Sequence, residues 1–235
     1  VRGVTLTGSD GAGRHVGSVA SKALKKTVLE LGSNDAYLVL EDAEIETAVK
    51  YSVIGRLYNN GETCVSAKRF IVADKVYDAF VSAFVDQMKA AKMGDPTDED
   101  TQLGPLSSDA QFETVKEQVD ESVAKGAKAL CGGKAPDRAG EFYPATVLAD
   151  VAPGMPAYDD EIFGPVAAVI RAKDDEDAMR IANDSRYGLG GGIFSQNEER
   201  ALRLARDHFD TGMIRINSFG AADPNMPFGG VKDSG

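Results

Sequence analysis

The stretch that decides the fold is Thr27-Val-Leu-Glu-Leu-Gly-Ser-Asn-Asp-Ala-Tyr-Leu-Val-Leu-Glu41, in which two short apolar runs flank a polar break. The runs, Val28–Leu31 and Ala36–Leu40, have the length of buried strands. The break, Gly32–Asp35, has the glycine and polar residues of a turn. The stretch therefore predicts two separate strands and places Glu30 near the end of the first.

Strands and helices alternate on both sides of this stretch. Val4–Thr7 is typical of a strand, and a helix-like segment follows it to about Lys26. Downstream, helices are expected over about residues 75–91, 108–125, 175–183 and 198–206, and strands over residues 69–73, 127–131, 145–149, 166–171, 191–195 and 213–217. This alternation predicts an α/β fold with a largely parallel sheet flanked by helices.

A further helix is expected between the quoted stretch and the first cysteine. Asp42 is a candidate N-cap, because its side chain can accept hydrogen bonds from the free amides of a first turn. An apolar stripe at spacings of four follows: Ile45, Val49, Val53 and Leu57. Asn59-Asn60-Gly61 should end this helix, since Asn and Gly tolerate left-handed backbone.

The composition excludes several classes of protein. A net charge of −11 over 235 residues argues against nucleic-acid binding and against anionic membranes. No apolar run approaches the roughly 18–20 residues that span a bilayer, and the start does not resemble a secretory signal. The two cysteines and two histidines form no cluster with metal-ligand spacing. We therefore expect a cytoplasmic protein with no metal site and reduced thiols.

Cys64 has two interpretations from its surroundings. Free cysteine is often a small buried apolar residue. This one, however, follows a turn and has polar or charged neighbours, namely Glu62, Thr63, Ser66, Lys68 and Arg69. Loops carry many catalytic groups because they can project them into a cleft. The local sequence leaves both a core cysteine and a nucleophile open.

Glu30 and the turn Gly8–Gly13 are the other candidates for chemistry. A carboxylate in an apolar strand is costly to bury unless it has a function or partners, although a strand-end glutamate can also reach solvent. Gly8–Gly13 lies between a strand and a helix, where amides and the helix dipole can meet phosphate. It lacks the GxGxxG pattern, so an ordinary turn and a nucleotide contact both stay open.

Several short segments together resemble, in order and spacing, the NAD(P)-dependent aldehyde dehydrogenase superfamily. They are Thr7-Gly-Ser9, Leu29-Glu-Leu-Gly32, Asn60-Gly-Glu-Thr-Cys64, Lys92-Met-Gly-Asp-Pro96, Gly104-Pro-Leu106, Glu161-Ile-Phe-Gly-Pro165 and Pro227-Phe-Gly-Gly-Val-Lys-Asp-Ser-Gly235. The segments around Glu30–Asp35 and Cys64 are similar to those of bacterial succinate-semialdehyde dehydrogenases. The resemblance covers essentially the whole chain.

The resemblance implies a catalytic pair. Cys64 would attack an aldehyde carbonyl, with its own backbone N–H stabilising the oxyanion, and would pass through a thiohemiacetal and a thioester. Glu30 would act as the base for the thiol or for the hydrolytic water. The implied product is a carboxylic acid, with succinate semialdehyde as the expected substrate and NAD or NADP as the cofactor.

The resemblance also implies cofactor contacts. Ser9 would meet the pyrophosphate where Gly8 lets the backbone approach. Glu161 would hold ribose hydroxyls, and Phe163 would pack near the nicotinamide. Leu31 is the remaining expected cofactor contact.

The chain would then be a fragment with two parts. Residues 1–32 would be the tail of a Rossmann-like NAD(P)-binding domain, and residues 33–235 the catalytic domain without its C-terminal oligomerisation segment. The full-length protein would be a homo-oligomer that acts on a small-molecule aldehyde.

Two departures from the family pattern leave alternatives open. Ser33 replaces a usual glycine and would add bulk near the base. Tyr58 stands where some succinate-semialdehyde enzymes carry arginine, which leaves the anchor for a substrate carboxylate unassigned.

The rival functions are an acylating dehydrogenase and, for the 235 residues alone, a folded but inactive domain.

Overall fold

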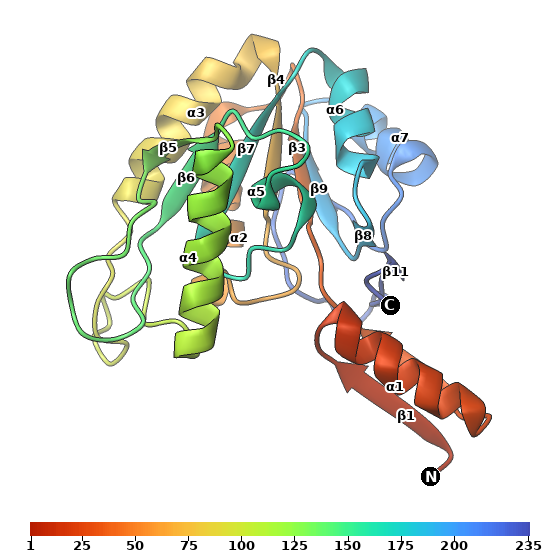
Figure 1. Ribbon diagram of the computed structural model, residues 1–235. Helices are drawn as coiled ribbons and strands as arrows, with labels where there is room; N and C mark the ends of the chain where they lie inside the picture. The colour runs from red at the N-terminus through yellow and green to blue at the C-terminus, as the bar shows by residue number, and fades with distance from the viewer.

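A seven-stranded sheet forms the centre of the computed structural model, which describes residues 1–235 (Figure 1). Its strand order is β10-β9-β3-β4-β7-β6-β5. The strands are β3 (Ala36–Val39), β4 (Arg69–Ala73), β5 (Lys128–Cys131), β6 (Thr146–Ala149), β7 (Val166–Ala172), β9 (Gly191–Phe194) and β10 (Arg215–Ile216). Only the β5–β6 pair is antiparallel. The expected α/β fold with a largely parallel sheet is confirmed.

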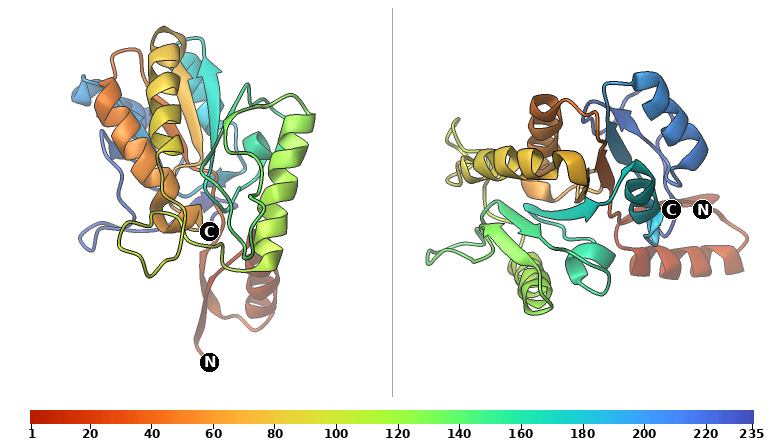
Figure 2. Two further views of the ribbon diagram at one scale, coloured as in Figure 1. Left: turned by 90° about the vertical axis from the view of Figure 1, so that its left-hand side faces the viewer. Right: turned by 90° about the horizontal axis from the view of Figure 1, so that it is seen from above.

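Helices cover both faces of this sheet (Figure 2). One face carries α2 (Ile45–Leu57) and α3 (Asp74–Lys89), and the other carries α4 (Asp109–Ala124), α5 (Pro156–Asp159), α6 (Asp175–Asn183) and α7 (Glu198–His208). Alternate strand residues enter the two cores. Leu38 faces the α4–α7 side, for example, while Tyr37 and Val39 face α2 and α3. The central strands are buried on both faces, as expected for parallel strands.

A small unit lies apart from the main sheet, at the lower right of Figure 1. It consists of β1 (Gly3–Thr7), α1 (Asp10–Lys22) and β2 (Lys26–Glu30), with β1 and β2 parallel. Helix α1 ends before the expected Lys26 because that residue already opens β2. A last two-stranded sheet pairs β8 (Tyr187–Gly188) with β11 (Val231–Lys232). The sequence pattern indicated neither of these two-residue strands, nor α5.

The two ends of α2 test two predictions from the sequence: the N-cap prediction is wrong, and the prediction of a left-handed stop is confirmed. Asp42 does not cap the helix, because the Glu44 carboxylate accepts the amides of Glu46 and Thr47 instead. Asp42 accepts a hydrogen bond of 2.8 Å from the Ser195 hydroxyl. At the other end, Asn59, Asn60 and Gly61 have φ of 50°, 58° and 75°, so the predicted left-handed stop is present.

No helix combines the length and the apolar character that a bilayer-spanning segment requires.

The α3 side of the core offers a test of this packing. Phe84 is fully buried, with its ring centroid 4.9 Å from that of Phe70 and 5.2 Å from that of Phe80. We expect Phe84→Ala to lower the free energy of unfolding by about 3–5 kcal/mol, because it leaves a cavity that the sheet cannot close. Phe84→Leu should cost clearly less in the same urea titration. Equal small losses for both would contradict the described core.

Candidate active site

A cleft of about 530 Å³ lies where the small β1–α1–β2 unit meets the main sheet. Its walls come from the β1–α1 turn, the end of β2, the loop after α2, helix α4 and the loop after α5. The lining residues are Thr7, Gly8, Ser9, Glu30, Leu31, Gly32, Glu62, Thr63, Cys64, Gln111, Glu161 and Phe163. The structure thus brings every site residue expected from the sequence to one cavity.

The loop that carries Cys64 is held in place by its flanks. Gly61 is required by its close packing as well as by its positive φ, because a Cβ there would lie 2.3 Å from the Gly164 carbonyl oxygen. The Asn60 side chain accepts from the Gly104 amide and donates to the Pro105 carbonyl, both at 3.0 Å. The turn that ends α2 therefore also ties the Cys64 loop to residues 104–105.

Cys64 itself is half-buried and has a free backbone amide. Burial raises the pKa of the Cys64 thiol, the Lys68 ammonium lowers it, and the carboxylates of Asp35 and Glu161 raise it further. The Cys64 N–H donates to no other group of the chain. A thiol with a raised pKa needs a base, and a free amide beside it is suited to stabilise a developing oxyanion.

Glu30 ends β2 at the edge of the same cleft. Its Oε2 atom is buried without a hydrogen-bond partner, and desolvation raises the pKa of this carboxyl. A buried carboxylate oxygen without a hydrogen-bond partner destabilises the folded protein unless it binds a proton or a water molecule. A raised pKa brings a glutamate closer to the working range of a general base near neutral pH.

Glu161 faces Cys64 from the loop after α5. Its Oε1 atom lies 3.2 Å from the Lys68 ammonium nitrogen but takes no hydrogen bond, so this contact is purely electrostatic. Gly32 leaves the space that Glu161 occupies, since a Cβ at Gly32 would lie 2.6 Å from Oε2. This carboxylate therefore has acceptor capacity left for a ligand with hydroxyl groups.

Helix α4 holds the Glu161 loop from outside. Gln111 Nε2 donates to the Phe163 carbonyl at 2.8 Å, and Gln118 Nε2 donates to the Glu161 carbonyl at 3.0 Å. Neither glutamine was expected from the sequence to support the site. The two glutamines are seven residues apart, so they lie on one face of the helix. This spacing indicates a role in the site only once α4 is known to pack against the Glu-Ile-Phe-Gly-Pro segment.

The β1–α1 turn forms the opposite end of the cleft. Ser9 is the N-cap of α1, and its hydroxyl accepts from the Ala12 amide. The nearest side-chain atom to a Cβ at Gly8 would be 3.9 Å away, so the backbone is open there. The Asp10 carboxylate, which would repel an anion, is paired at 2.7 Å with Arg186. These residues fit a phosphate group at a helix N-terminus.

Ser33 does not act as expected from the sequence. Instead of crowding Glu30, its side chain is fully buried and donates a short hydrogen bond to the Cys64 carbonyl. It also accepts a hydrogen bond of 3.0 Å from Lys68. Tyr58 is 49% exposed and packs on Phe219, with ring centroids 5.8 Å apart.

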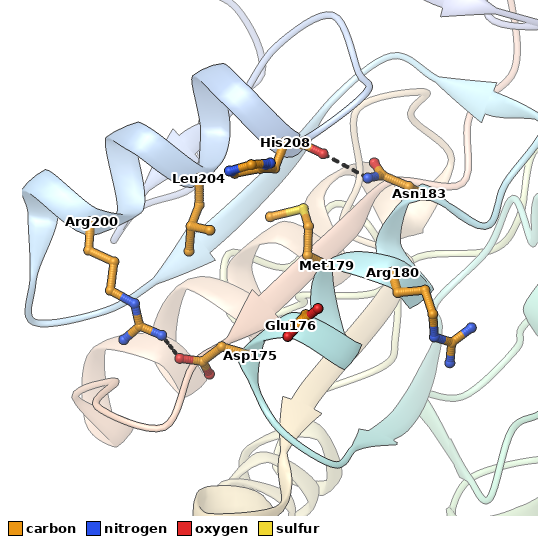
Figure 3. Close-up of a pocket in the computed structure, with 8 residues that line it drawn as sticks. All are labelled: Asp175, Glu176, Met179, Arg180, Asn183, Arg200, Leu204 and His208. Atoms are coloured by element: carbon orange, nitrogen blue, oxygen red, sulfur yellow. Dashed lines mark hydrogen bonds and ion pairs between the residues drawn. The ribbon is translucent and has the colours of Figure 1, made fainter.

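A second cavity of about 570 Å³ lies between α6 and α7 (Figure 3). Several of its polar groups are already engaged: Arg200 pairs with Asp175, and Asn183 donates to the His208 carbonyl at 2.7 Å. No cysteine or other expected site residue lines it. We therefore take the Cys64 cleft as the candidate active site.

The chain belongs to the aldehyde dehydrogenase family, whose sequence model matches residues 1–235. It is similar to the succinate-semialdehyde dehydrogenase (NADP+) of Mycobacterium leprae, with 46% identity over 235 residues that cover 100% of this chain and 51% of that protein. The enzyme of the same name from Deinococcus radiodurans is 47% identical, with 49% of its length covered. The chain thus spans about half the length of the curated relatives it matches.

Solved structures agree with this assignment. The succinic semialdehyde dehydrogenase of Streptococcus pyogenes, solved with NADP+, superposes with a TM-score of 0.95 at 45% identity, over 99% of this chain and 51% of that one. Betaine aldehyde dehydrogenase of Staphylococcus aureus, solved with NAD+, gives 0.95 at 33% identity, over 100% and 47%. The fold that the family resemblance implied is therefore confirmed by these two structures.

Gly32 provides a test of the Glu161 geometry. If Glu161 holds a dinucleotide as the family resemblance implies, Gly32→Ala in the full-length protein should displace Glu161 and raise the Kd for NAD+ or NADP+ by roughly 10- to 100-fold, because small misplacements at a site are costly. The matched control is Gly17→Ala, whose Cβ would meet only Leu29 at an ordinary 3.6 Å. Fluorescence titration measures both. Unchanged NADP+ affinity in a folded Gly32→Ala variant would contradict this placement of Glu161.

Proposed function

We propose that the full-length protein oxidises a small aldehyde to the carboxylic acid, with NAD or NADP, through a thioester at Cys64. The observation that carries this proposal is the composition of one cleft. A thiol with a free backbone amide, an unpartnered carboxyl with raised pKa and an open helix N-terminus all face it. Membership of the aldehyde dehydrogenase family supports aldehyde oxidation independently.

The first step uses Cys64 after its thiol has given its proton to solvent water or to the Glu30 carboxylate. Its thiolate attacks the aldehyde carbonyl carbon, a C–S bond forms, and the carbonyl oxygen becomes an oxyanion beside the Cys64 N–H. Because that amide has no competing acceptor in the chain, it can donate fully to the oxyanion. A single donor of this kind is typically worth about 10²–10³ in rate. Bound nicotinamide cofactor supplies the acceptor for the hydride that leaves the same carbon.

The last step uses Glu30. Its carboxylate takes a proton from a water molecule whose oxygen attacks the thioester carbonyl. The C–S bond then breaks, the acid leaves, and Cys64 returns as thiolate. Desolvation makes Glu30 a stronger base than an exposed glutamate, because the charged form is disfavoured until it accepts the proton.

The residues that would hold the cofactor line the rest of the cleft. Ser9 and Gly8 would meet phosphate at the start of α1, and Glu161 would accept from ribose hydroxyls. Phe163 and Leu31 would bound the nicotinamide. Relatives solved with NADP+ and with NAD+ support a dinucleotide but leave the choice between the two open for this chain.

The substrate proposal is succinate semialdehyde, on the strength of the relatives' names. Its carboxylate needs a cation, and Tyr58 supplies none. Arg215 is the candidate we propose: it lies with Val65, the neighbour of Cys64, around a cavity of about 10 Å³ that Asp35 also lines, so a substrate carboxylate would have to widen this cavity. Its guanidinium forms no ion pair within the chain, so it is available to an anion.

The rival functions have less support. An acylating dehydrogenase passes its thioester to phosphate or coenzyme A and can dispense with a hydrolytic base, whereas Glu30 is present and desolvated here. The 235 residues alone should be inactive if residues 1–32 are, as we propose, only the tail of the cofactor domain and residues 33–235 the catalytic domain. Homo-oligomerisation and a cytoplasmic location stay predictions.

Kinetics of the full-length protein test the proposed mechanism. Cys64→Ala should abolish aldehyde-dependent NADPH formation, because no other thiol lines the cleft. Glu30→Gln should still give a burst of NADPH but should slow steady turnover about 10²- to 10⁴-fold, the usual contribution of a general base. Wild-type turnover by Cys64→Ala would rule out the covalent route.

The pH profile gives a second check on Glu30. Because the pKa of Glu30 is raised, its basic form is lost as the pH falls through a value above the ordinary 4.5. Hydrolysis of the thioester should therefore decline on the acid side of that raised pKa in wild type. Glu30→Gln should lose this acid limb. An unchanged limb in the variant would assign the titration to another group.

Arg215 tests the substrate class. Arg215→Gln should raise KM for succinate semialdehyde by about 10- to 100-fold, since a charge-assisted contact is worth roughly 1.5–3 kcal/mol. KM for butanal, which has no carboxylate, should stay within about twofold. Equal changes for both aldehydes would exclude Arg215 as the carboxylate anchor.

A further inference from the structure

Lys68 is a buried cation that the mechanism above does not use. Its side chain is only 3% exposed, and the residue immediately precedes β4. The ammonium nitrogen lies 2.7 Å from the Cys64 carbonyl oxygen, 3.0 Å from Ser33 Oγ and 3.2 Å from Glu161 Oε1. It also lies 3.3 Å from the carbonyl oxygens of Thr63 and Ser66. An ammonium group has only three protons, so the Lys68 ammonium cannot donate to all five oxygens at once and is shared among them.

The contact with Thr63 has a geometric consequence for Cys64. The Thr63 carbonyl and the Cys64 N–H belong to one planar trans peptide, in which the two bonds point in opposite directions. A cation that holds the Thr63 oxygen therefore turns the Cys64 N–H away from itself. The same cation, with Ser33, holds the Cys64 carbonyl on the next peptide. Both peptide planes around the thiol are thereby fixed.

The charges around the thiol make the same cation electrostatically important. The carboxylates of Asp35 and Glu161 raise the pKa of Cys64, and Lys68 lowers it. Glu30 and Glu62 line the same cleft. The other buried cation of this cluster, Arg56, interacts with Glu161 and Asp35 and donates at 2.8 Å to the Gly61 carbonyl. Lys68 is thus the cation that opposes the carboxylates of Asp35 and Glu161 at the thiol.

We propose that Lys68 is a positioning residue for the reaction: with Ser33 it fixes the peptides on both sides of Cys64, aims the Cys64 N–H into the cleft and holds Glu161 beside it. This proposal rests on the proposed function for the identity of the reaction. The lowering of the Cys64 pKa by the Lys68 charge does not depend on the proposed function, because the charge acts on the thiol before any substrate binds.

The test is the pH profile of Cys64 alkylation by iodoacetamide in the full-length protein, which requires no turnover. Lys68→Met should move the midpoint upward by about one unit and slow alkylation at neutral pH about tenfold, because the thiolate loses its cation. It should also lower kcat for aldehyde oxidation and raise KM for NADP+. Lys68→Arg keeps the charge, so its alkylation midpoint should stay near that of wild type.

Arg69 supplies a matched control. It is the next residue and equally buried, but it points away from the cleft and donates to the carbonyls of Asn34, Ile181 and Ala182. Arg69→Lys should lower thermal stability and leave the alkylation midpoint unchanged. A purely structural role for Lys68 predicts the same pattern for Lys68→Met, and that result would overturn the proposal.

Ser33→Ala decides the question if Lys68→Met does not fold. It removes the hydrogen bonds that Ser33 Oγ makes with the Cys64 carbonyl and with the Lys68 ammonium, and it keeps the positive charge of Lys68. We expect kcat to fall about 2- to 10-fold, the range for one such bond, with an unmoved alkylation midpoint. Wild-type kcat in Ser33→Ala would overturn the proposal. If wild type oxidises no aldehyde, the proposed function fails, yet the alkylation profiles still test Lys68.

Discussion

The structure depends on one buried polar segment, Gly32–Asp35, between β2 and β3. Such a segment is stable only if its hydrogen-bonding groups are satisfied. The Ser234 hydroxyl donates to the Gly32 carbonyl, Asn34 Nδ2 donates to the Tyr158 carbonyl, and Asp35 accepts the Gly190 amide. Each of these bonds joins the segment to a different part of the chain. The meeting of the small β1–α1–β2 unit with the main sheet is therefore fixed, and the cleft is formed there.

The same segment links the two proposed catalytic groups. Glu30 stands just before it at the end of β2, and Ser33 within it binds the carbonyl of Cys64. Lys68 closes the arrangement by contacting Ser33, Cys64 and Glu161 together. Burial raises the pKa of both groups. The raised pKa makes Glu30 a better base, but it makes the Cys64 thiol harder to ionise, so that the thiolate depends on a nearby cation.

The fold could be predicted from the sequence, and the residues predicted for the site line one cleft, but the contacts between them could not be predicted. Continuous apolar runs such as Ala36–Leu40 have the length of a buried strand, which the local sequence reveals, and the Asn59–Gly61 stop follows from backbone preferences. The prediction that Asp42 caps α2 is wrong. Glu44 lies closer to the first turn, and Asp42 instead accepts a hydrogen bond from Ser195, which is distant in the sequence. Lys68 and Ser33 lie 35 positions apart, and only the completed fold shows that they meet.

The central claim is that Cys64 carries the reacting acyl group. It is tested most directly by acid-quenching the full-length protein during turnover of succinate semialdehyde with NADP+ and mapping acylated peptides by mass spectrometry. The account predicts a succinyl group on the peptide that contains Cys64 and on no other. Turnover without any acylated peptide, or acylation at a different residue, would contradict it.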